Sequence, residues 1–467
     1  METTRILERG SFVAGNSWTT AVYCRDRYPW TSFQVVTDSL SLEDLLSWFS
    51  RGHREEKDFC LGLEYEMFLT NSKGAPLPYE GPSGVEELLA AFAERTGWKL
   101  KSEAGRIFGL DGGDGRNLSL EPGAQVEFNS SPCASLVDLE REFQEMLGHF
   151  RALTEDSQVL FLGLGAHPVA SPSEIKRIPK ARYDILEPWL TEAGELGLWM
   201  MKATCGTQVN FDHSGPRDAA KKLRVALGLA PVLNALFANS SIRAGQPSGY
   251  ASWRGHVWSK TDPSRCGWIP PCVQETSSLE DYANWALDVP MLFIEREHGL
   301  VDMRGQRFRE YWMSGKATLE DWDLHLSTLF PEARLRPQIE LRSIDGGCPL
   351  MALALCALVK GIFYSEQALD AAWALVSDWS DEERDRTWHE AHRHGLSGIA
   401  PCGNPLRKLA NALLDKAELS PEETPYLNPL KKILEGGYSE GELTLQLWEK
   451  DWGGDMSRLL QSANWFH

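Results

Sequence analysis

The stretch Gly62-Leu63-Glu64-Tyr65-Glu66-Met67-Phe68 sets the fold of this chain, because acidic and apolar side chains alternate along it. Side chains of a β-strand point to opposite faces of the sheet in turn. Glu64 and Glu66 therefore share one face, and the apolar residues beside them share the other. The stretch predicts a strand with one acidic face and one buried apolar face.

Three further segments alternate in the same way, with carboxylates, amides and one arginine gathered on one face. An ordinary solvated sheet face would also carry lysines and threonines. If the four strands share a sheet, this face is a dense acidic wall that needs cations to balance it. The segments are Leu120-Glu121-Pro122-Gly123-Ala124-Gln125-Val126-Glu127-Phe128, Thr207-Gln208-Val209-Asn210-Phe211 and Gln338-Ile339-Glu340-Leu341-Arg342.

The size and charge of the chain limit its class. Its 467 residues are 42% hydrophobic and 10% aromatic, which is enough for a substantial core in one large domain or a few smaller ones. A net charge of -19 argues against nucleic acid or an anionic membrane as the partner. It leaves room for a phosphorylated substrate, because bound divalent cations reverse the local field. The longest apolar run, residues 349–359, is too short to span a bilayer and predicts a buried helix.

The cysteines and the first residues favour a reducing compartment. The nine cysteines are scattered, odd in number and without a C-x-x-C pair, a pattern typical of buried reduced thiols. Met1-Glu2-Thr3-Thr4-Arg5 has no apolar core of a secretory signal. We therefore expect a soluble cytoplasmic protein, a monomer or homodimer, whose partners are small molecules.

Helices and strands alternate irregularly along the chain, and several strands are amphipathic. This pattern favours an α+β fold with an antiparallel or mixed sheet over a doubly wound parallel sheet. Capping signals predict helix starts at Ser41, Ser83, Ser135 and Thr318. Further helices are expected over residues 216–238, 279–287, 350–364, 366–378, 381–393, 404–417 and 428–434. Strands are expected over residues 60–69, 117–130, 159–166, 203–212, 291–296 and 336–343.

Two larger regions differ in character from the rest. Residues 241–275 are rich in Gly, Pro, Ser, Trp and Arg with little periodicity, which predicts a long functional loop. Residues 368–467 are almost purely helical. We therefore divide the chain into a catalytic domain, residues 1–367, and a helical C-terminal subdomain packed on it, residues 368–467.

The common nucleotide and hydrolase signatures are absent from the sequence. It contains no P-loop, no strand followed by G-x-G-x-x-G and no G-x-S-x-G elbow. Gly163-Leu164-Gly165 lacks the third glycine, so we expect it only to turn the chain. His389-Glu390-Ala391-His392 has the wrong spacing for a zinc helix, which needs histidines at i and i+4.

The acidic faces point to hard cations and a phosphorylated ligand. About six oxygen ligands suit Mg²⁺ or Mn²⁺, whereas zinc prefers the His and Cys that these faces lack. Arg342, on the same face as Glu340, is placed to hold a transferring phosphoryl group. Two other classes stay open: a glycosidase-like hydrolase with paired carboxylates and no metal dependence, and a nucleotide-binding protein without catalysis, against which the intact acidic set argues.

The ordered motifs of the chain resemble those of the glutamate–cysteine ligase family of the plant and proteobacterial type. The resemblance extends from about residue 40 to about residue 435. It rests on GLEYE (62–66), SLEPGAQVE (119–127), FLGLG (161–165), PKARY (179–183), MKATCGTQVN (201–210), ALFANS (235–240), TDP (261–263), ALDVPM (286–291) and ELR (340–342).

This resemblance implies both a fold and a reaction. The fold would be a curled, mostly antiparallel sheet forming a funnel, similar to glutamine synthetase. The reaction would be ATP-dependent ligation of the γ-carboxylate of glutamate to the amine of cysteine through γ-glutamyl phosphate, the first step of glutathione biosynthesis. ATP and Mg²⁺ would be required, with Mn²⁺ able to replace Mg²⁺.

The resemblance also implies roles for single residues. Arg342, Glu66 and Arg254 would form the catalytic set, with Arg254 also clamping the α-carboxylate of glutamate and Arg342 the phosphate. The other substrate-binding residues would be Arg182, Tyr183, Thr204 and Arg265, and the other nucleotide-binding residues Asn210 and Lys202. The metal ligands would be Glu64, Glu66, Glu121, Glu127, Gln208 and Glu340.

Some positions depart from the family pattern. Tyr65 stands where His is usual, Ala124 where Gly is usual, and Ser343 and Ile344 where small residues are usual. These changes spare the metal and phosphate groups but bear on the acceptor side. The sequence therefore leaves one close alternative, the same chemistry with another amine in a thiol-cofactor or natural-product pathway.

Overall fold

An antiparallel sheet organises the fold and contains all four acidic-faced segments. The structure, a computed structural model, describes residues 40–465. The strands of the sheet are β1 (Leu61–Thr70), β2 (Lys99–Glu103), β3 (Arg106–Asp111), β4 (Asn117–Leu120), β5 (Val126–Asn129), β6 (Leu160–Leu162), β7 (Gly206–Phe211), β14 (Ala333–Leu335) and β15 (Ile339–Asp345). They follow the order β14-β15-β7-β1-β5-β4-β3-β2, with β6 paired to the end of β1. All these pairings are antiparallel, which confirms the expected α+β class. The funnel-like curl stays a prediction.

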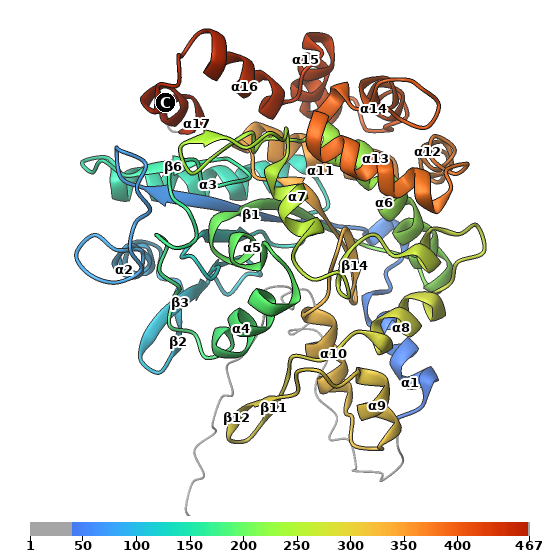
Figure 1. Cartoon of the computed structure of the whole chain (residues 1–467). Coiled ribbons are helices and arrows are strands. Elements are labelled where there is room, and N and C mark those ends of the chain that lie inside the picture. The colour runs from blue at the N-terminus through green and yellow to red at the C-terminus, as the bar shows by residue number, and fades with distance from the viewer. Residues whose placement is uncertain (1–39, 466–467) are drawn as a thin grey trace, which may run out of the picture.

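Helices cover both faces of this sheet (Figure 1). In chain order they are α1 (Leu42–Ser47), α2 (Val85–Thr96), α3 (Leu136–Thr154), α4 (Tyr183–Ala193), α5 (Gly197–Ala203), α6 (Pro216–Leu236), α7 (Trp253–Ser259), α8 (Leu279–Asp288), α9 (Phe308–Met313), α10 (Leu319–Ser327), α11 (Pro349–Phe363), α12 (Glu366–Trp373), α13 (Asp381–His394), α14 (Leu406–Leu414), α15 (Asn428–Gly436), α16 (Glu440–Lys450) and α17 (Met456–Ala463). Short ladders are formed by β8 (Ile242–Arg243) with β9 (Gln246–Pro247), β10 (Cys266–Gly267) with β13 (Phe330–Pro331), and β11 (Phe293–Arg296) with β12 (Gly299–Asp302).

The strand register aligns the acidic side chains in rows. Glu64 of β1 lies opposite Gln208 of β7, and Glu66 lies opposite Glu127 of β5. Residues directly opposite one another on antiparallel strands point to the same face. The shared polar face expected from the sequence is therefore confirmed.

The other face of β1 is packed by α3 and α11. Tyr65 is fully buried there, and its ring meets Phe143 edge-on with 4.9 Å between centroids. Its hydroxyl donates to the carbonyl oxygen of Gly347 at 2.7 Å. Tyr65 therefore belongs to the packing behind the sheet and does not reach the polar face.

The pairing of β15 with β7 contains one irregularity. Leu341 lies opposite Val209, but Ile344 lies opposite Thr207, so β15 has one residue more than β7 over this span. Because of this β-bulge, the alternation of side chains between the two faces of the sheet shifts by one residue after the bulge.

The single strand expected over residues 117–130 is wrong, because the chain turns between β4 and β5. Pro122 has no N–H to give to a ladder, and the main-chain N–H of Glu121 bonds to the carbonyl of Gln125 at 3.0 Å across the turn. Ala124 adopts φ 65° in this turn, in the left-handed region that favours glycine. This backbone conformation explains why a glycine is usual at this position in the family that the sequence resembles.

Most capping signals mark true helix starts. Ser41 and Thr318 form capping boxes, and Ser135 caps α3 through its side chain. For α2 the prediction is wrong by one residue, because Gly84 and not Ser83 is the N-cap. The segment expected as a loop over residues 241–275 contains α7, while the hairpin β2–β3 and the helices α4 and α5 carry no signal that we recognised.

The C-terminal helices pack on α6 and α11 and lie along the top of the molecule in Figure 1. The helix α6 is buried along nearly all of its length, between β15 on one side and α13 on the other. The domain boundary at residue 367 stays a prediction. Among residues 40–465, no single helix has the length and hydropathy to cross a bilayer; α11 and α12 would qualify only together, and they are bent by 97°.

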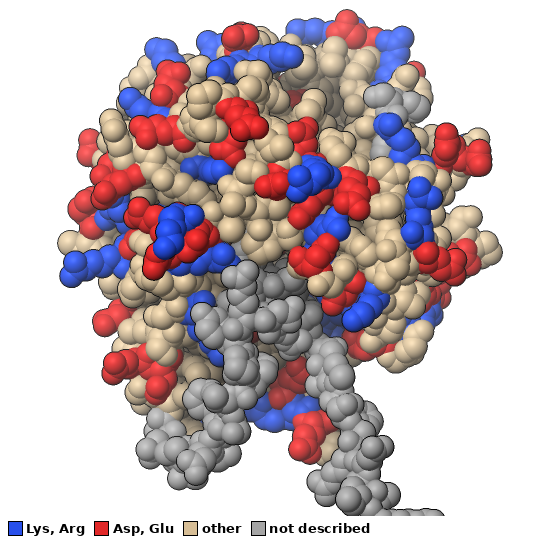
Figure 2. Space-filling model, turned by 180° about the vertical axis from the view of Figure 1, so that it is seen from behind, with Lys and Arg blue, Asp and Glu red and all other residues tan. Residues whose placement is uncertain are grey.

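Acidic and basic side chains lie next to one another over the back of the molecule (Figure 2). Near the protein surface, Arg116 forms ion pairs with Asp114 at 2.6 Å and with Glu145 at 2.8 Å. Exposed pairs of this kind contribute only about 0–1 kcal/mol each. They neutralise part of the net charge locally and have little bearing on stability.

Candidate active site

A cavity of about 130 Å³ opens over the polar face of the sheet, beneath α4, α5 and α7. Strand β1, the β4–β5 turn, β7 and β15 supply its floor. Ten predicted site residues line it: Glu64, Glu66, Glu121, Glu127, Arg182, Tyr183, Thr204, Gln208, Arg254 and Arg342. The structure therefore brings most of the predicted constellation together in one place.

The carboxylates on the floor of the cavity are buried and close to one another. Burial, together with the negative charge of Glu340, raises the pKa of Glu64 to about 8. Burial and the charge of Glu121 raise the pKa of Glu66 to about 7. Burial and neighbouring glutamates also raise the pKa of Glu127 well above its usual value. The nearby arginines offset the raised pKa of Glu64 and Glu66 only in part, so a bound cation would further stabilise the ionised carboxylates.

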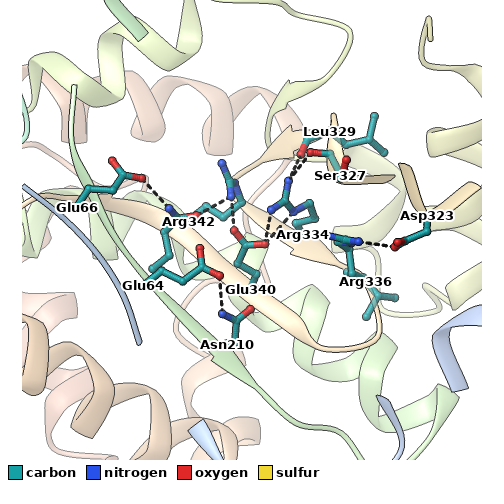
Figure 3. A network of polar contacts seen from close by, with 12 residues as sticks. Glu64, Glu66, Asn210, Asp323, Ser327, Leu329, Arg334, Arg336, Glu340 and Arg342 are labelled. Carbon is teal, nitrogen blue, oxygen red and sulfur yellow. Dashed lines mark hydrogen bonds and ion pairs between the residues drawn. The ribbon is translucent and has the colours of Figure 1, made fainter. Parts of the chain in front are cut away.

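The negative charge of Glu340 is balanced within the protein, because two arginines flank this residue (Figure 3). Arg334 reaches Glu340 with Nη2 at 2.6 Å, and Arg342 forms an ion pair with its other oxygen. Burial alone would raise the pKa of Glu340, but Arg334 and Arg342 hold it below its usual value. Arg342 also donates to Gln208 Oε1 at 2.6 Å. The guanidinium of Arg342 is thus fixed over the polar face of β7.

Arg254 enters the cavity from α7. Its side chain is almost fully buried, and Nη2 donates to the main-chain oxygen of Arg342 at 3.3 Å. Trp258, one turn along α7, places its ring 5.6 Å from the Arg254 guanidinium and 5.8 Å from that of Arg342. Burial lowers the pKa of Arg254, while the carboxylate of Glu66 opposes the shift. The two arginines and this tryptophan form one cationic side of the cavity.

The remaining side of the cavity is apolar. Leu186 and Leu190 of α4 and Met200 and Met201 of α5 line it beside the ring of Tyr183. The cavity thus combines an acidic floor, an arginine side and an apolar side. This arrangement suits anionic ligands that carry a short, weakly polar group.

Two predicted substrate or nucleotide residues, Arg265 and Lys202, do not line the cavity, and their assigned roles stay predictions. Arg265 is fully buried and pairs with Asp262 at 2.7 Å, while its other nitrogens donate to main-chain oxygens. Lys202 is turned toward Glu187 at 3.6 Å. Each of these cations has an acidic partner within the protein, which accounts for its position outside the cavity.

Two other predicted residues lie behind the cavity wall. Asn210 donates to Glu64 at 2.8 Å, so it supports an acidic residue and does not line the cavity itself. Glu340 is held between its two arginines. Both contact residues that line the cavity, and their predicted roles stay predictions.

Two arginines that were not among the predicted site residues, Arg334 and Arg336, also line the cavity. Arg336 is tied to Asp323 by an ion pair (Figure 3). A signal was present, because the run Ala333-Arg334-Leu335-Arg336 alternates like the acidic strands. Gln125 also lines the cavity, and its amide donates to the carbonyl of Thr204 at 2.9 Å.

The donor set fits a hard divalent cation, although the carboxylates are engaged with protein partners. Among residues 40–465, no three His, Cys, Asp or Glu side chains are arranged to hold a metal ion. Glu66, for example, accepts from the N–H of Gly206 at 2.6 Å and from Gln208 at 2.9 Å. The raised pKa values of Glu64 and Glu127 nevertheless mark a site short of positive charge. The predicted ligand set stays a prediction.

Two plant enzymes illustrate the relatives of this chain. Glutamate–cysteine ligase, chloroplastic, from Nicotiana tabacum is 35% identical over 434 residues, which cover 90% of this chain and 82% of the relative. The enzyme of the same name from Arabidopsis thaliana is 34% identical with the same coverage. Because these relatives are named chloroplastic, the expectation of a cytoplasmic protein is wrong. It rested on the lack of an apolar signal core, which plastid transit peptides do not need, and on Met1–Arg5, which lie outside the described residues.

A solved structure and a family model complete the comparison. Glutamate–cysteine ligase from Francisella tularensis, solved in complex with AMP, shares the fold with a TM-score of 0.55, at 12% identity and 88% coverage of each chain. The model of glutamate–cysteine ligase family 2 matches residues 60–462. The resemblance noted in the sequence motifs is therefore confirmed, and the chain belongs to glutamate–cysteine ligase family 2.

Proposed function

We propose that this protein is an ATP-dependent glutamate–cysteine ligase that makes γ-glutamylcysteine, the first step of glutathione biosynthesis. The observation that carries the proposal is the pairing of an acidic sheet face with Arg342 and Arg254 in one cavity. A carboxylate–amine ligase must bring two anions, ATP and glutamate, into contact. This requires positive charge on both sides of the reacting groups.

Arg342 is the residue we assign to the transferring phosphoryl group. It stands beside the acidic floor, held by Glu340 and Gln208. Its planar fork can bind two phosphoryl oxygens at once. When the γ-carboxylate of glutamate attacks the γ-phosphorus of ATP, ADP leaves and γ-glutamyl phosphate forms. Arg342 would stabilise the charge that spreads over the phosphoryl oxygens in this step.

The buried acidic residues would hold magnesium with ATP. Bound Mg²⁺ would neutralise the phosphate oxygens and orient the γ-phosphate toward the attacking carboxylate. Glu64, Glu66 and Glu127 supply hard oxygen donors, and Glu121 lies at the edge of the same floor. With the cation bound, these carboxylates would stay ionised despite their burial.

Glutamate and its acceptor would occupy the two remaining sides. Arg254 is placed to bind the α-carboxylate of glutamate, with Arg182 near the opposite wall. The amine of cysteine then attacks the acyl carbon of γ-glutamyl phosphate, releasing phosphate and forming the amide. Leu186 and Met201 offer an apolar surface that a thiol side chain can contact without losing hydrogen bonds.

An ADP-release assay with glutamate and single amines tests the proposal. ADP should appear with ATP, Mg²⁺, glutamate and cysteine together, and γ-glutamylcysteine should form in equal amount. ADP with another amine but not with cysteine would move the acceptor to a different pathway. Hydrolysis of a glycoside in the absence of ATP would contradict the ligase assignment and indicate a hydrolase.

A further inference from the structure

A buried aspartate at the end of β15 has no part in the reaction described so far. Asp345 is 3% exposed and does not line the cavity. Its carboxylate accepts three hydrogen bonds: from the N–H of Asn239 at 2.8 Å, the hydroxyl of Ser240 at 2.6 Å and the hydroxyl of Ser252 at 2.8 Å. Three donors on one buried carboxylate fix its position and that of each partner.

Both serines also bind the main chain of the first turn of α7. The oxygen of Ser240 accepts from the N–H of Arg254 at 3.0 Å, and the oxygen of Ser252 accepts from the N–H of Gly255 at 2.9 Å. A hydroxyl that donates its hydrogen to a carboxylate keeps its lone pairs for such an N–H. Asp345 therefore sets the direction of both hydroxyl groups, and through them the position of α7.

The guanidinium of Arg254 depends on this main-chain position. Among the described residues, its one hydrogen bond is the long one to the carbonyl of Arg342, and its Nε has no hydrogen-bond partner. The helix α7 has seven residues, so few internal hydrogen bonds hold it in place. A shift of its first turn would carry Arg254 with it.

We propose that Asp345 is a positioning residue that aligns Arg254 with the carboxylate of glutamate through Ser240 and Ser252. This inference rests on the proposed function, because it takes Arg254 as the glutamate clamp. Asp345 touches no substrate in this scheme. Its effect is to fix the residue that does.

A glycine of the FLGLG motif supports the role of Asp345. A Cβ at Gly165 would lie 2.6 Å from Cγ of Asp345 and 2.8 Å from its Oδ2. The backbone can approach the carboxylate this closely only without a side chain. The expectation that this motif merely turns the chain is therefore incomplete, because Gly165 also leaves room for Asp345.

Steady-state kinetics of Asp345→Asn test the proposal on the full chain. An amide keeps one acceptor oxygen and replaces the other with an NH₂ donor, so at least one of the two hydroxyl groups loses its acceptor and its fixed direction. We expect the KM for glutamate to rise roughly 10- to 100-fold, as misplaced binding groups commonly cause, while the KM for ATP stays within about twofold. Ser252→Ala should raise the glutamate KM in the same direction, and Ser252→Thr, which keeps the hydroxyl, should restore it.

Two comparisons separate positioning from loss of structure. In an Arg254→Lys background, Asp345→Asn should add little to the glutamate KM, because the residue through which it acts is already changed. Asp212→Asn is the matched control, since Asp212 is a fully buried aspartate just past β7 that accepts from the N–H of Cys60. It should lower stability and leave the glutamate KM unchanged.

The outcomes distinguish this inference from the proposed function. A wild-type chain without glutamate-dependent ADP release overturns both. An active wild type whose Asp345→Asn and Ser252→Ala variants keep the wild-type glutamate KM overturns the positioning role alone. An undiminished effect of Asp345→Asn in the Arg254→Lys background also contradicts it. If Asp345→Asn does not fold, the Ser252→Ala and Ser252→Thr pair decides.

Discussion

Gly206 of β7 lies directly beneath the guanidinium of Arg254, and a Cβ at position 206 would stand 2.5 Å from its Nη2. The same residue donates its N–H to Glu66 at 2.6 Å. One glycine thus separates a carboxylate expected to bind a cation from an arginine expected to bind substrate. The close approach of these two charges needs a residue without a side chain.

The substitution Gly206→Ala should therefore displace Arg254 and weaken glutamate binding. The alanine keeps the N–H, so the contact with Glu66 survives. We expect the KM for glutamate to rise by roughly tenfold or more, since a shift of about 1 Å in a binding group can cost that much. The KM for ATP should stay near its wild-type value, and both constants come from initial-rate measurements.

A second glycine serves as the control for this experiment. Gly109 in β3 is equally crowded, with a Cβ position 2.4 Å from the carbonyl oxygen of Leu118. Gly109→Ala should lower the thermal midpoint without changing the glutamate KM. If both variants raise that KM alike, the effect of Gly206→Ala comes from general distortion of the sheet.

Replacing Arg342 with lysine should remove most of the activity and spare the fold. Lysine keeps the charge but cannot bind Glu340, Gln208 and a phosphoryl group with one planar fork. We expect kcat to fall by roughly 100-fold or more, which is the usual cost of losing one fixed donor to a developing charge. Arg296→Lys, which alters the distant ion pair with Asp321, is the matched control. A wild-type kcat in Arg342→Lys would contradict the assignment.

Removal of divalent cations should abolish turnover. Chelation with EDTA is expected to stop ADP release, and Mg²⁺ or Mn²⁺ should restore it. Binding of Mn²⁺, followed by electron paramagnetic resonance, should weaken in Glu66→Gln. Glu440→Gln is the control, because Glu440 is a carboxyl group outside the cavity whose pKa burial raises to about 7. Full activity in EDTA would favour the hydrolase class.

His325 should make the fold sensitive to acid. It is fully buried, and burial lowers its pKa from 6.5 to about 3. Below pH 6.5, His325 binds a proton in the unfolded chain but stays neutral in the folded chain. The free energy of unfolding therefore falls as the pH drops from 6.5 toward 3. Between pH 6.5 and pH 5 this one group should cost about 2 kcal/mol.

Urea unfolding of the wild type and of His325→Gln at several pH values measures this effect. The wild-type free energy of unfolding should fall more steeply below pH 6.5, by about one proton per molecule. Equal slopes for the two proteins would show that another group takes up the proton.

The polar face of the sheet could be predicted because its signal is periodic. Glu64 and Glu66 alternate with apolar residues, and three other segments repeat the pattern, so the shared face follows from strand geometry alone. The turn at Ala124 was not predicted, because polar and apolar residues alternate on both sides of Pro122 and Gly123 and the whole run resembles one strand. When two successive strands such as β4 and β5 both alternate, the alternation does not show where the first strand ends.

The predicted residues that lie outside the cavity include an arginine and a lysine, whose long side chains can reach several partners. Arg265 has Asp262 three residues before it, and in the folded chain that carboxylate binds it. Lys202 turns toward Glu187, a residue of α4 that the sequence does not place beside it. Arg334 and Arg336 lie in a short edge region whose alternation covers only four residues. The partner of Lys202 is thus fixed by tertiary contacts, which local sequence patterns do not show.

The irregular pairing of β15 has a consequence for sequence change in this enzyme. Because β15 has one extra residue before Ile344, Asp345 lies opposite Gly206 and falls on the same face as Glu340. Loss of that residue would invert the parity of the strand and turn Asp345 to the opposite face of the sheet, away from Ser240 and Ser252. A substitution at Ser343 should therefore be tolerated where a deletion of one residue is not, so activity should depend on the length of this strand as well as on its side chains.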